Sequence, residues 1–137
     1  LYKAADNGVK IKMIVRGICC LIPTQHKNIK IISIIDRFLE HTRIFIFNNN
    51  KKNETYISSA DWMTRNLDNR VEVTCPIHDS KIKKEINDIF NIYWSDNVKS
   101  RLINQKDANV YKSDIKKSNS IRSQLEIYNY YKSKIEN

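Results

Sequence analysis

Side chains able to handle phosphate groups are concentrated between Glu40 and Glu72 of this sequence. His41 comes first, Arg43 follows it, and Arg65 lies further on among strand-like apolar segments. An arginine guanidinium offers a planar set of donors for phosphate oxygens, and a histidine can carry or pass a proton near neutral pH. These residue types predict a site that binds and transfers phosphoryl groups.

His41 stands two residues before Arg43, so in an extended backbone both side chains point to the same face. Glu72 lies between Val71 and Val73, and a glutamate inside a short apolar strand is costly to bury without a partner. We therefore expect Glu72 to hydrogen-bond His41, to fix its tautomer and to support its charged form. The alternative for Glu72 is an exposed position on an edge strand.

Arg16 ends a predicted strand directly before Gly17. Ligands of open α/β sheets bind at this end of the strands, and a glycine lets a phosphate approach the backbone. The alternative for Arg16 is a surface residue at a strand end. Arg65, on a predicted short helix, is a second candidate for phosphate binding. Further hydroxyl and carboxylate partners are Ser58, Ser59 and Asp61.

The chain has 137 residues, of which 41% are hydrophobic, so we expect a single domain over residues 1–137. It carries 24 Lys and Arg against 15 Asp and Glu, and this net charge of +9 favours an anionic partner. No apolar run approaches the roughly 20 residues needed to span a bilayer, and nothing resembles a signal peptide. Residues 1–8 look like the last turns of a helix ended by Gly8, so we expect a fragment of a larger protein.

The three cysteines, Cys19, Cys20 and Cys75, lack the spacing of metal ligands, because adjacent cysteines form a poor chelating pair. We expect them to be buried thiols in a reducing compartment. His26 and His78 lie in polar, loop-like stretches. No metal site is predicted from these residues.

Apolar spacing and turn residues predict the order of the elements. Strands are expected at residues 10–16, 42–47, 55–60 and 71–75, with the second and third strands forming a hairpin. Helices are expected at residues 28–40, 61–66 and 96–104, from Asp79 through Tyr93, and from Ser120 onward. Residues 106–119 are polar and rich in lysine, and we expect a mobile segment there. Together these elements predict a layered α/β domain.

The run from Tyr56 to Glu72 closely resembles the second C-terminal domain of bacterial-type polyphosphate kinases, as do residues 14–23, 33–41 and 94–101. These four blocks occur in the right order and the resemblance covers nearly the whole chain. The loop after Pro23 is shorter than usual, and lysines largely replace the arginine-rich tail of the family. The resemblance implies a phospholipase-D-like layered α/β domain, with a mixed β-sheet flanked by helices and with C-terminal helices.

The resemblance also implies an activity, the reversible transfer of the terminal phosphate of ATP to polyphosphate through a phosphohistidine, with Mg2+. The phosphorylated histidine and the magnesium-binding residues of the family belong to preceding domains, outside this chain. His41 matches the second essential histidine of the family, which lies with the counterpart of Arg16 against the ATP phosphates. Glu72 matches the glutamate that hydrogen-bonds the motif histidine in phospholipase-D-like proteins, and Arg43 stands where those proteins have a lysine.

This interpretation places Arg16, His41, Arg43 and Arg65 at phosphate oxygens and makes His41 and Glu72 the catalytic pair. It expects the fragment alone to be inactive. The expected partners are ATP or ADP, polyphosphate, the preceding domains and further copies of the chain, with no nucleic acid. The expected location is the cytoplasm, and membrane association is not readable from the sequence.

Two other functions fit the same residues. A phospholipase-D-like phosphodiesterase or nuclease would use His41 as the nucleophile on a lipid or nucleic acid, and it would need a lysine where Arg43 stands. A non-catalytic basic module would bind RNA or another polyanion with a steep salt dependence, and it would lose little on His41→Ala.

Overall fold

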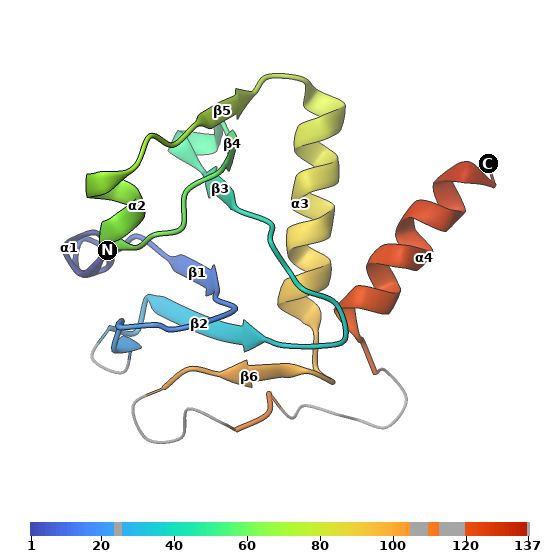
Figure 1. The fold of residues 1–137 in the computed structure, drawn as a ribbon, viewed down its shortest axis with the longest axis horizontal. Coiled ribbons are helices and arrows are strands. Elements are labelled where there is room, and N and C mark those ends of the chain that lie inside the picture. Colours follow the sequence, from blue (N-terminus) through green and yellow to red (C-terminus); the bar gives the residue numbers. More distant parts are fainter. Residues whose placement is uncertain (24–25, 105–109, 113–119, 137) are drawn as a thin grey trace. The chain divides into compact units, whose positions relative to one another are not determined.

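The computed structural model describes residues 1–23, 26–104, 110–112 and 120–136. The chain forms two compact units, which we call unit 1 (Leu1–Glu40 with Asn91–Asn137) and unit 2 (His41–Phe90). Each unit contains a three-stranded sheet together with helices (Figure 1). The predicted α/β class is confirmed, and the expectation of a single domain stays a prediction.

The sheet of unit 1 is mixed. Strand β1 (Ile11–Ile14) runs parallel to β2 (Ile29–Ile34), and β6 (Ser100–Leu102) runs antiparallel to β2 on its other side. Residues 110–112 add an isolated antiparallel bridge to β6. The central strand β2 therefore has its backbone hydrogen-bonded on both sides, as the predicted mixed sheet requires.

The core of unit 1 forms where helix α1 (Tyr2–Asp6) packs on this sheet. Ala5, Ile29 and Ile31 are almost fully buried at its centre. Partly buried side chains around them are Ile11, Met13, Val15, Cys19, Leu21 and Ile103. Gly8 follows α1 with a φ of +88°, a backbone conformation that glycine adopts without steric cost. The predicted helix end at Gly8 is thus confirmed.

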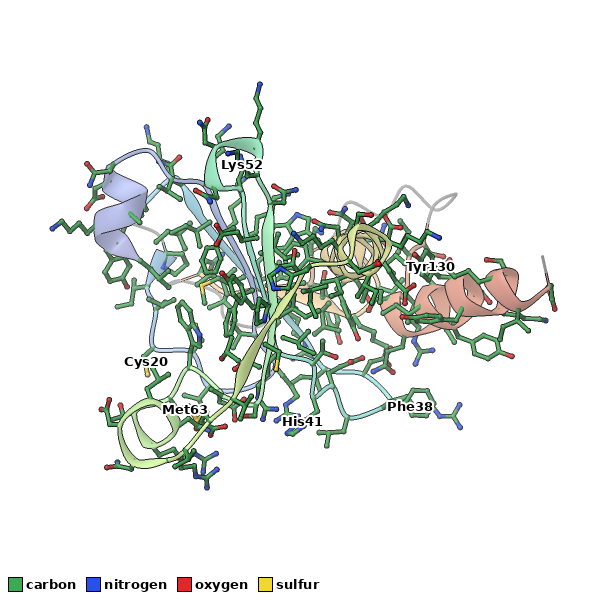
Figure 2. All side chains as sticks on the ribbon, turned by 90° about the horizontal axis from the view of Figure 1, so that it is seen from above. Cys20, Phe38, His41, Lys52, Met63 and Tyr130 are labelled. Atoms are coloured by element: carbon green, nitrogen blue, oxygen red, sulfur yellow. The ribbon has the colours of Figure 1, made fainter. Side chains whose placement is uncertain are left out.

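The sheet of unit 2 is an antiparallel meander of β3 (Ile44–Phe47), β4 (Glu54–Ser58) and β5 (Thr74–Ile77). The predicted hairpin is formed by β3 and β4. Its turn contains the short 3-10 element η2 (Asn49–Lys51), where all three residues have positive φ, and asparagine tolerates this conformation better than most residues. Lys52 projects from this turn (Figure 2).

Two of the helices predicted in the second half of the chain are confirmed. Helix α3 (Ser80–Ser95) follows β5, and Asp79 Oδ1 accepts hydrogen bonds from two backbone N–H groups of its first turn at 2.8 and 2.9 Å. This is the predicted cap. The boundary between the two units falls within α3, after Phe90. The terminal helix α4 (Ser123–Ile135) confirms the helix expected from Ser120 onward.

The helix predicted over residues 28–40 is wrong, because residues 29–34 form strand β2. The isoleucines of this segment fit a helical spacing as well as a strand, so periodicity alone could not decide. Their β-branched side chains favour a strand, and four of them are buried there: Ile29, Ile31, Ile32 and Ile34.

The helix predicted over residues 96–104 is also wrong. Asp96 Oδ1 accepts the backbone N–H groups of Val98, Lys99 and Ser100 at 2.7 to 3.0 Å, and the chain then enters β6 instead of continuing as a helix. An aspartate satisfies a turn in the same way as it caps a helix, which explains the error.

Three smaller expectations need correction. The strand predicted over residues 71–75 begins only at Thr74. The short helix α2 (Thr64–Asn69) begins later than Asp61, whose carboxylate binds Arg43 instead of capping a helix. Cys20 and Cys75 are exposed and only Cys19 is partly buried.

The segment 106–119, predicted to be mobile, lies outside the described residues except for 110–112. Within the described ranges, no helix combines the length and the apolar character needed to cross a membrane.

Candidate functional site

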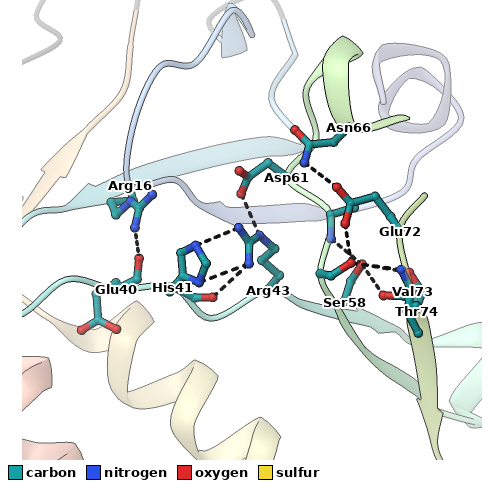
Figure 3. Close-up of polar contacts among 12 residues, drawn as sticks. Arg16, Glu40, His41, Arg43, Ser58, Asp61, Asn66, Glu72, Val73 and Thr74 are labelled. Carbon is teal, nitrogen blue, oxygen red and sulfur yellow. Dashed lines mark hydrogen bonds and ion pairs between the residues drawn. The ribbon is translucent and has the colours of Figure 1, made fainter. Parts of the chain in front are cut away.

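His41, Arg43 and Asp61 form a connected group in unit 2 (Figure 3). His41 and Arg43 lie just before β3, and Asp61 lies just after β4, the neighbouring strand. Arg43 Nη2 is 3.0 Å from His41 Nε2, and Arg43 Nη1 is 3.4 Å from His41 Nδ1. Arg43 Nε donates to Asp61 Oδ1 at 2.8 Å. The predicted proximity of His41 and Arg43 is confirmed.

Arg43 links a carboxylate to the histidine ring. The hydrogen bond with Asp61 raises the pKa of Arg43, against the opposing effect of desolvation, so this guanidinium stays charged. To donate to His41 Nε2 it needs a lone pair on that nitrogen, which the imidazole has only in its neutral form. Because Arg43 faces both ring nitrogens, the donor and acceptor roles of Nε2 and Nδ1 depend on the tautomer of the imidazole. The ring is exposed to solvent (Figure 2).

Glu72 belongs to a second cluster of unit 2. One of its carboxylate oxygens accepts from Asn66 Nδ2 at 2.7 Å and the other from the hydroxyl of Ser59. The bonds from Ser59 and Asn66 outweigh desolvation and hold the pKa of Glu72 below its usual range, with smaller contributions from the charges of Arg70 and Arg43. This carboxylate is therefore ionised and already paired.

The predicted direct hydrogen bond between Glu72 and His41 is not formed among the described residues. Glu72 lies before β5, and β4 separates β5 from β3 in the sheet. The apolar neighbours that suggested a buried strand are exposed, since Val71 is 100% and Val73 61% solvent-accessible. The carboxylate linked to His41 is that of Asp61, through Arg43.

The paired serines hold the loop around Glu72. Ser58 Oγ lies 2.8 Å from Thr74 Oγ1 and accepts the backbone N–H of Ala60 at 3.1 Å. Ser59 Oγ accepts the N–H of Val73 at 3.0 Å while its hydroxyl donates to Glu72. The hydroxyls of Ser58 and Ser59 therefore bond to neighbouring residues and stabilise this loop.

Arg65 lies on α2 and is exposed. No ion pair or hydrogen bond of its side chain, with His41 or any other partner, occurs within the described residues. An exposed guanidinium of this kind is free to bind an anion, so its predicted role as a phosphate ligand stays a prediction.

Arg16 belongs to unit 1 and follows β1. One guanidinium nitrogen, Nη1, donates to the backbone carbonyl of Glu40 (Figure 3). Arg16 and Glu40 line a pocket of about 200 Å3 within unit 1. The other lining residues are Ile34, Ile35, Asp36, Arg37, Phe38 and Leu39. Two arginines at one small pocket make it suitable for an anionic group.

Several polar contacts around this pocket have no local signal in the sequence. Tyr93 OH donates to Glu40 Oε2 at 2.6 Å, and Gln124 Nε2 donates to Glu40 Oε1 at 2.8 Å. Arg37 also lines the pocket. The partners of Glu40 are 53 and 84 residues away along the chain, so no local motif could have identified them.

Within the described residues, no group of three or more His, Cys, Asp or Glu side chains is placed to hold a metal ion. The carboxylates beside the predicted phosphate ligands already accept hydrogen bonds, Asp61 from Arg43 and Glu72 from Ser59 and Asn66.

Comparison with known proteins shows a consistent relationship. The family described as polyphosphate kinase C-terminal domain 2 matches residues 1–124. A polyphosphate kinase of Vibrio parahaemolyticus is 50% identical over 96% of this chain, and that of Escherichia coli K12 is 46% identical over 97%.

A solved structure agrees with this relationship. The crystal structure of polyphosphate kinase from Porphyromonas gingivalis matches 99% of the chain with a TM-score of 0.94 and 46% identity. This match is consistent with the expected phospholipase-D-like arrangement. The chain covers only 19 to 21% of the length of these three relatives.

Proposed function

The chain belongs to the polyphosphate kinase family, as its C-terminal domain 2, and from this premise we propose that it supplies phosphate-binding residues to an enzyme that transfers the terminal phosphate of ATP reversibly to polyphosphate. The observation that carries the proposal is the His41–Arg43–Asp61 group, in which a charged guanidinium is fixed beside an exposed histidine ring. Arg16 at its pocket gives independent support.

Phosphoryl transfer depends mainly on positioning and on neutralising charge at the phosphate oxygens. In this proposal Arg16 binds phosphate oxygens with the N–H groups that do not donate to Glu40. His41 contacts the transferring group through its exposed imidazole ring, and Arg43 holds that ring in place. Arg65, exposed on α2, is a further phosphate ligand.

Glu72 has an indirect role in this proposal. It fixes the loop between Ser59 and Asn66, and its charge contributes to keeping Arg43 protonated. Asp61 takes the orienting role that the sequence had suggested for Glu72. The orienting effect would then reach His41 through Arg43 rather than through a direct carboxylate–imidazole bond.

The remaining parts of the reaction are placed outside this chain. The phosphohistidine and the Mg2+ ligands expected for the reaction would come from other parts of the enzyme, so the chain alone is expected to make no polymer. Because ATP is produced and consumed in the cytoplasm, the proposal places the enzyme there.

The test uses the intact enzyme with His41→Ala and Arg16→Lys. We expect His41→Ala to lower kcat by about a hundred- to a thousandfold with little change in nucleotide affinity, because it removes an interaction with the transferring group. Arg16→Lys should also reduce activity, since an ammonium cannot replace the guanidinium fork. Initial rates of polyphosphate formation and nucleotide binding measure both effects.

Matched controls separate these roles from loss of a generic histidine or arginine. His78→Ala removes an exposed histidine, and Arg101→Lys changes an arginine of β6. Both controls should keep wild-type rates. If His41→Ala and Arg16→Lys behave like the controls, the phosphate-site assignment is wrong. The phosphodiesterase function would be favoured instead if the enzyme hydrolysed a phosphodiester without nucleotide and lost this activity in His41→Ala.

A further inference from the structure

The segment 35–40, which we call the pocket loop, is held by the beginning of α4. Arg122 forms a two-pronged ion pair with Asp36, with Nε to Oδ2 and Nη2 to Oδ1 both at 2.7 Å. Asp36 is nearly buried, with 3% of its side chain exposed, and the Arg122 hydrogen bond keeps its pKa lowered despite desolvation. The pair joins residues that are 86 apart in sequence.

Gln124 binds the pocket loop with both ends of its amide. Its Oε1 accepts the backbone N–H of Phe38 at 3.0 Å, and its Nε2 donates to the Phe38 carbonyl at 2.9 Å. This pairing imitates the backbone contact between two strands. The same Nε2 also donates to Glu40 Oε1 at 2.8 Å, so one side chain fixes two residues of the loop.

These contacts lead to Arg16. Glu40 is held on its side chain by Gln124 and by Tyr93 OH, and its backbone carbonyl is the acceptor for Arg16 Nη1. A shift of Glu40 would therefore move the acceptor that orients the guanidinium. All of these groups lie in unit 1.

We propose that Gln124 is a positioning residue for Arg16, acting through Glu40 and supported by the Arg122–Asp36 pair. The proposal rests on the proposed function only through the role of Arg16 as a phosphate ligand. It gives the start of the terminal helix a part in the reaction, although no residue of α4 lines the pocket.

The test is a double-mutant cycle in the intact enzyme. Gln124→Glu has nearly the same shape but places a carboxylate against Glu40 and against the Phe38 carbonyl. We expect it to lower kcat/KM by about ten- to a hundredfold, the range that a displaced binding group can cost. In an Arg16→Ala background the same substitution should lower kcat/KM by less than about threefold, because the guanidinium that Gln124 positions is absent. A purely structural role would give the same factor in both backgrounds.

Two further variants sharpen the cycle. In Glu40→Gln with Gln124→Glu, the amide and the carboxylate exchange places, so the contact between them can form again. Part of the loss should be recovered, while the carboxylate still faces the Phe38 carbonyl. Gln124→Met removes the hydrogen bonds without adding a charge, and it serves if Gln124→Glu does not fold. Asn129→Asp adds the same negative charge to an exposed position of α4 and should leave kcat/KM unchanged.

The outcomes separate the two proposals. If Arg16→Ala is as active as wild type, the proposed function fails at Arg16. The positioning role is overturned if Arg16→Ala is impaired but both Gln124 variants keep the kcat/KM of wild type. It is also overturned if the Gln124 variants lose the same factor in kcat/KM in the wild-type and the Arg16→Ala backgrounds. Coupling in the cycle with recovery in the exchange variant supports it.

Discussion

The two regions that carry the predicted phosphate ligands are held in different ways. In unit 2, the bonds that fix Arg43 and Glu72 join residues between 6 and 18 positions apart in sequence. In unit 1, the pocket loop beside Arg16 is fixed by Arg122 and Gln124, 84 to 86 positions away. The unit 2 cluster is thus encoded locally, whereas the loop beside Arg16 is fixed only when the start of the last helix is in place.

The comparison extends to the acidic residues. Asp36 and Asp96 of unit 1 are 3% and 0% exposed, on the side chain and the whole residue respectively, and each accepts several hydrogen bonds. Asp61 and Glu72 of unit 2 are only partly buried. Unsatisfied buried groups are more costly than exposed ones, so substitutions of Asp36 and Asp96 should act on stability, and those of Asp61 and Glu72 mainly on activity.

The largest effect on stability is expected for Asp96→Asn, which breaks the anchor of α4. Asp96 Oδ2 accepts both the N–H and the hydroxyl of Ser123 at 2.7 Å, and Oδ1 accepts three further N–H groups. An amide nitrogen in place of one oxygen leaves buried donors unpaired. We expect the free energy of local opening around residues 120–125 to fall by about 2–3 kcal/mol. Hydrogen-exchange mass spectrometry of the intact protein would detect this as faster exchange.

The same residue gives a pH dependence. Burial raises the pKa of Asp96, but the hydrogen bonds from Ser123, Lys99 and Ser100 outweigh it, so the folded pKa is lowered. Its stabilisation is therefore present above the unfolded value of about 4 and is lost as the pH falls through the folded pKa. Asp96→Asn should remove this acid sensitivity. The control is Asp88→Asn, which removes a carboxylate from the Lys84–Asp88 ion pair on α3. If residues 120–125 exchanged equally fast in both variants, Asp96 would not be the anchor of α4.

The fold was predictable where its signals are local. The amphipathic spacing of α3, the cap at Asp79 and the polar turn between β3 and β4 are all visible over short stretches. Strand β6 has three residues and is defined by its pairing with β2 and with residues 110–112, which no local pattern reveals. A helix is expected over residues 96–104 from the sequence, and the folded chain forms this strand there instead.

The same contrast between local and long-range signals applies to the candidate site. The proximity of His41 and Arg43 follows from their two-residue spacing, and the structure has it. The pairing of Glu72 with His41 was inferred from apolar neighbours, but Val71 is fully exposed, so apolar character did not mean burial. Gln124 could not be found at all, because its partners Phe38 and Glu40 are set only by the folded chain.

An intermediate effect is expected for Asp61→Asn, which tests the locally encoded cluster. The asparagine keeps an acceptor for Arg43 Nε but removes the charge that fixes this guanidinium beside His41. We expect kcat of the intact enzyme to fall on the order of tenfold, less than the cost of removing a charge partner from the site itself. Thermal unfolding should change little, because Asp61 is partly exposed.

The relation to His41 can be checked directly in this variant. If Asp61 acts through Arg43, the Asp61→Asn substitution should cost much less when His41 is already alanine. Losses that simply multiply would mean that Asp61 acts elsewhere, and the chain from Asp61 through Arg43 to His41 would then be incidental.

The smallest effect is expected for Glu72→Gln, the matched removal of a charge from the second cluster. Glutamine keeps one acceptor oxygen for Asn66 Nδ2, and Ser59, whose hydroxyl can also accept, can face the new amide group. The loop therefore retains most of its contacts. We expect the activation free energy to rise by about 1 kcal/mol or less, which corresponds to a fall in kcat of at most about fivefold.

This last variant separates the two carboxylates, because Asp61→Asn and Glu72→Gln each remove one negative charge at nearly constant shape. Steady-state rates of the two variants, measured side by side at several pH values, give the comparison. Glu72 contributes only a minor part of the charge effect on Arg43, after the hydrogen bond and the charge of Asp61. The Asp61 variant should therefore be the more impaired at every pH. A larger loss for Glu72→Gln would restore Glu72 as the main partner of the histidine in the assembled enzyme.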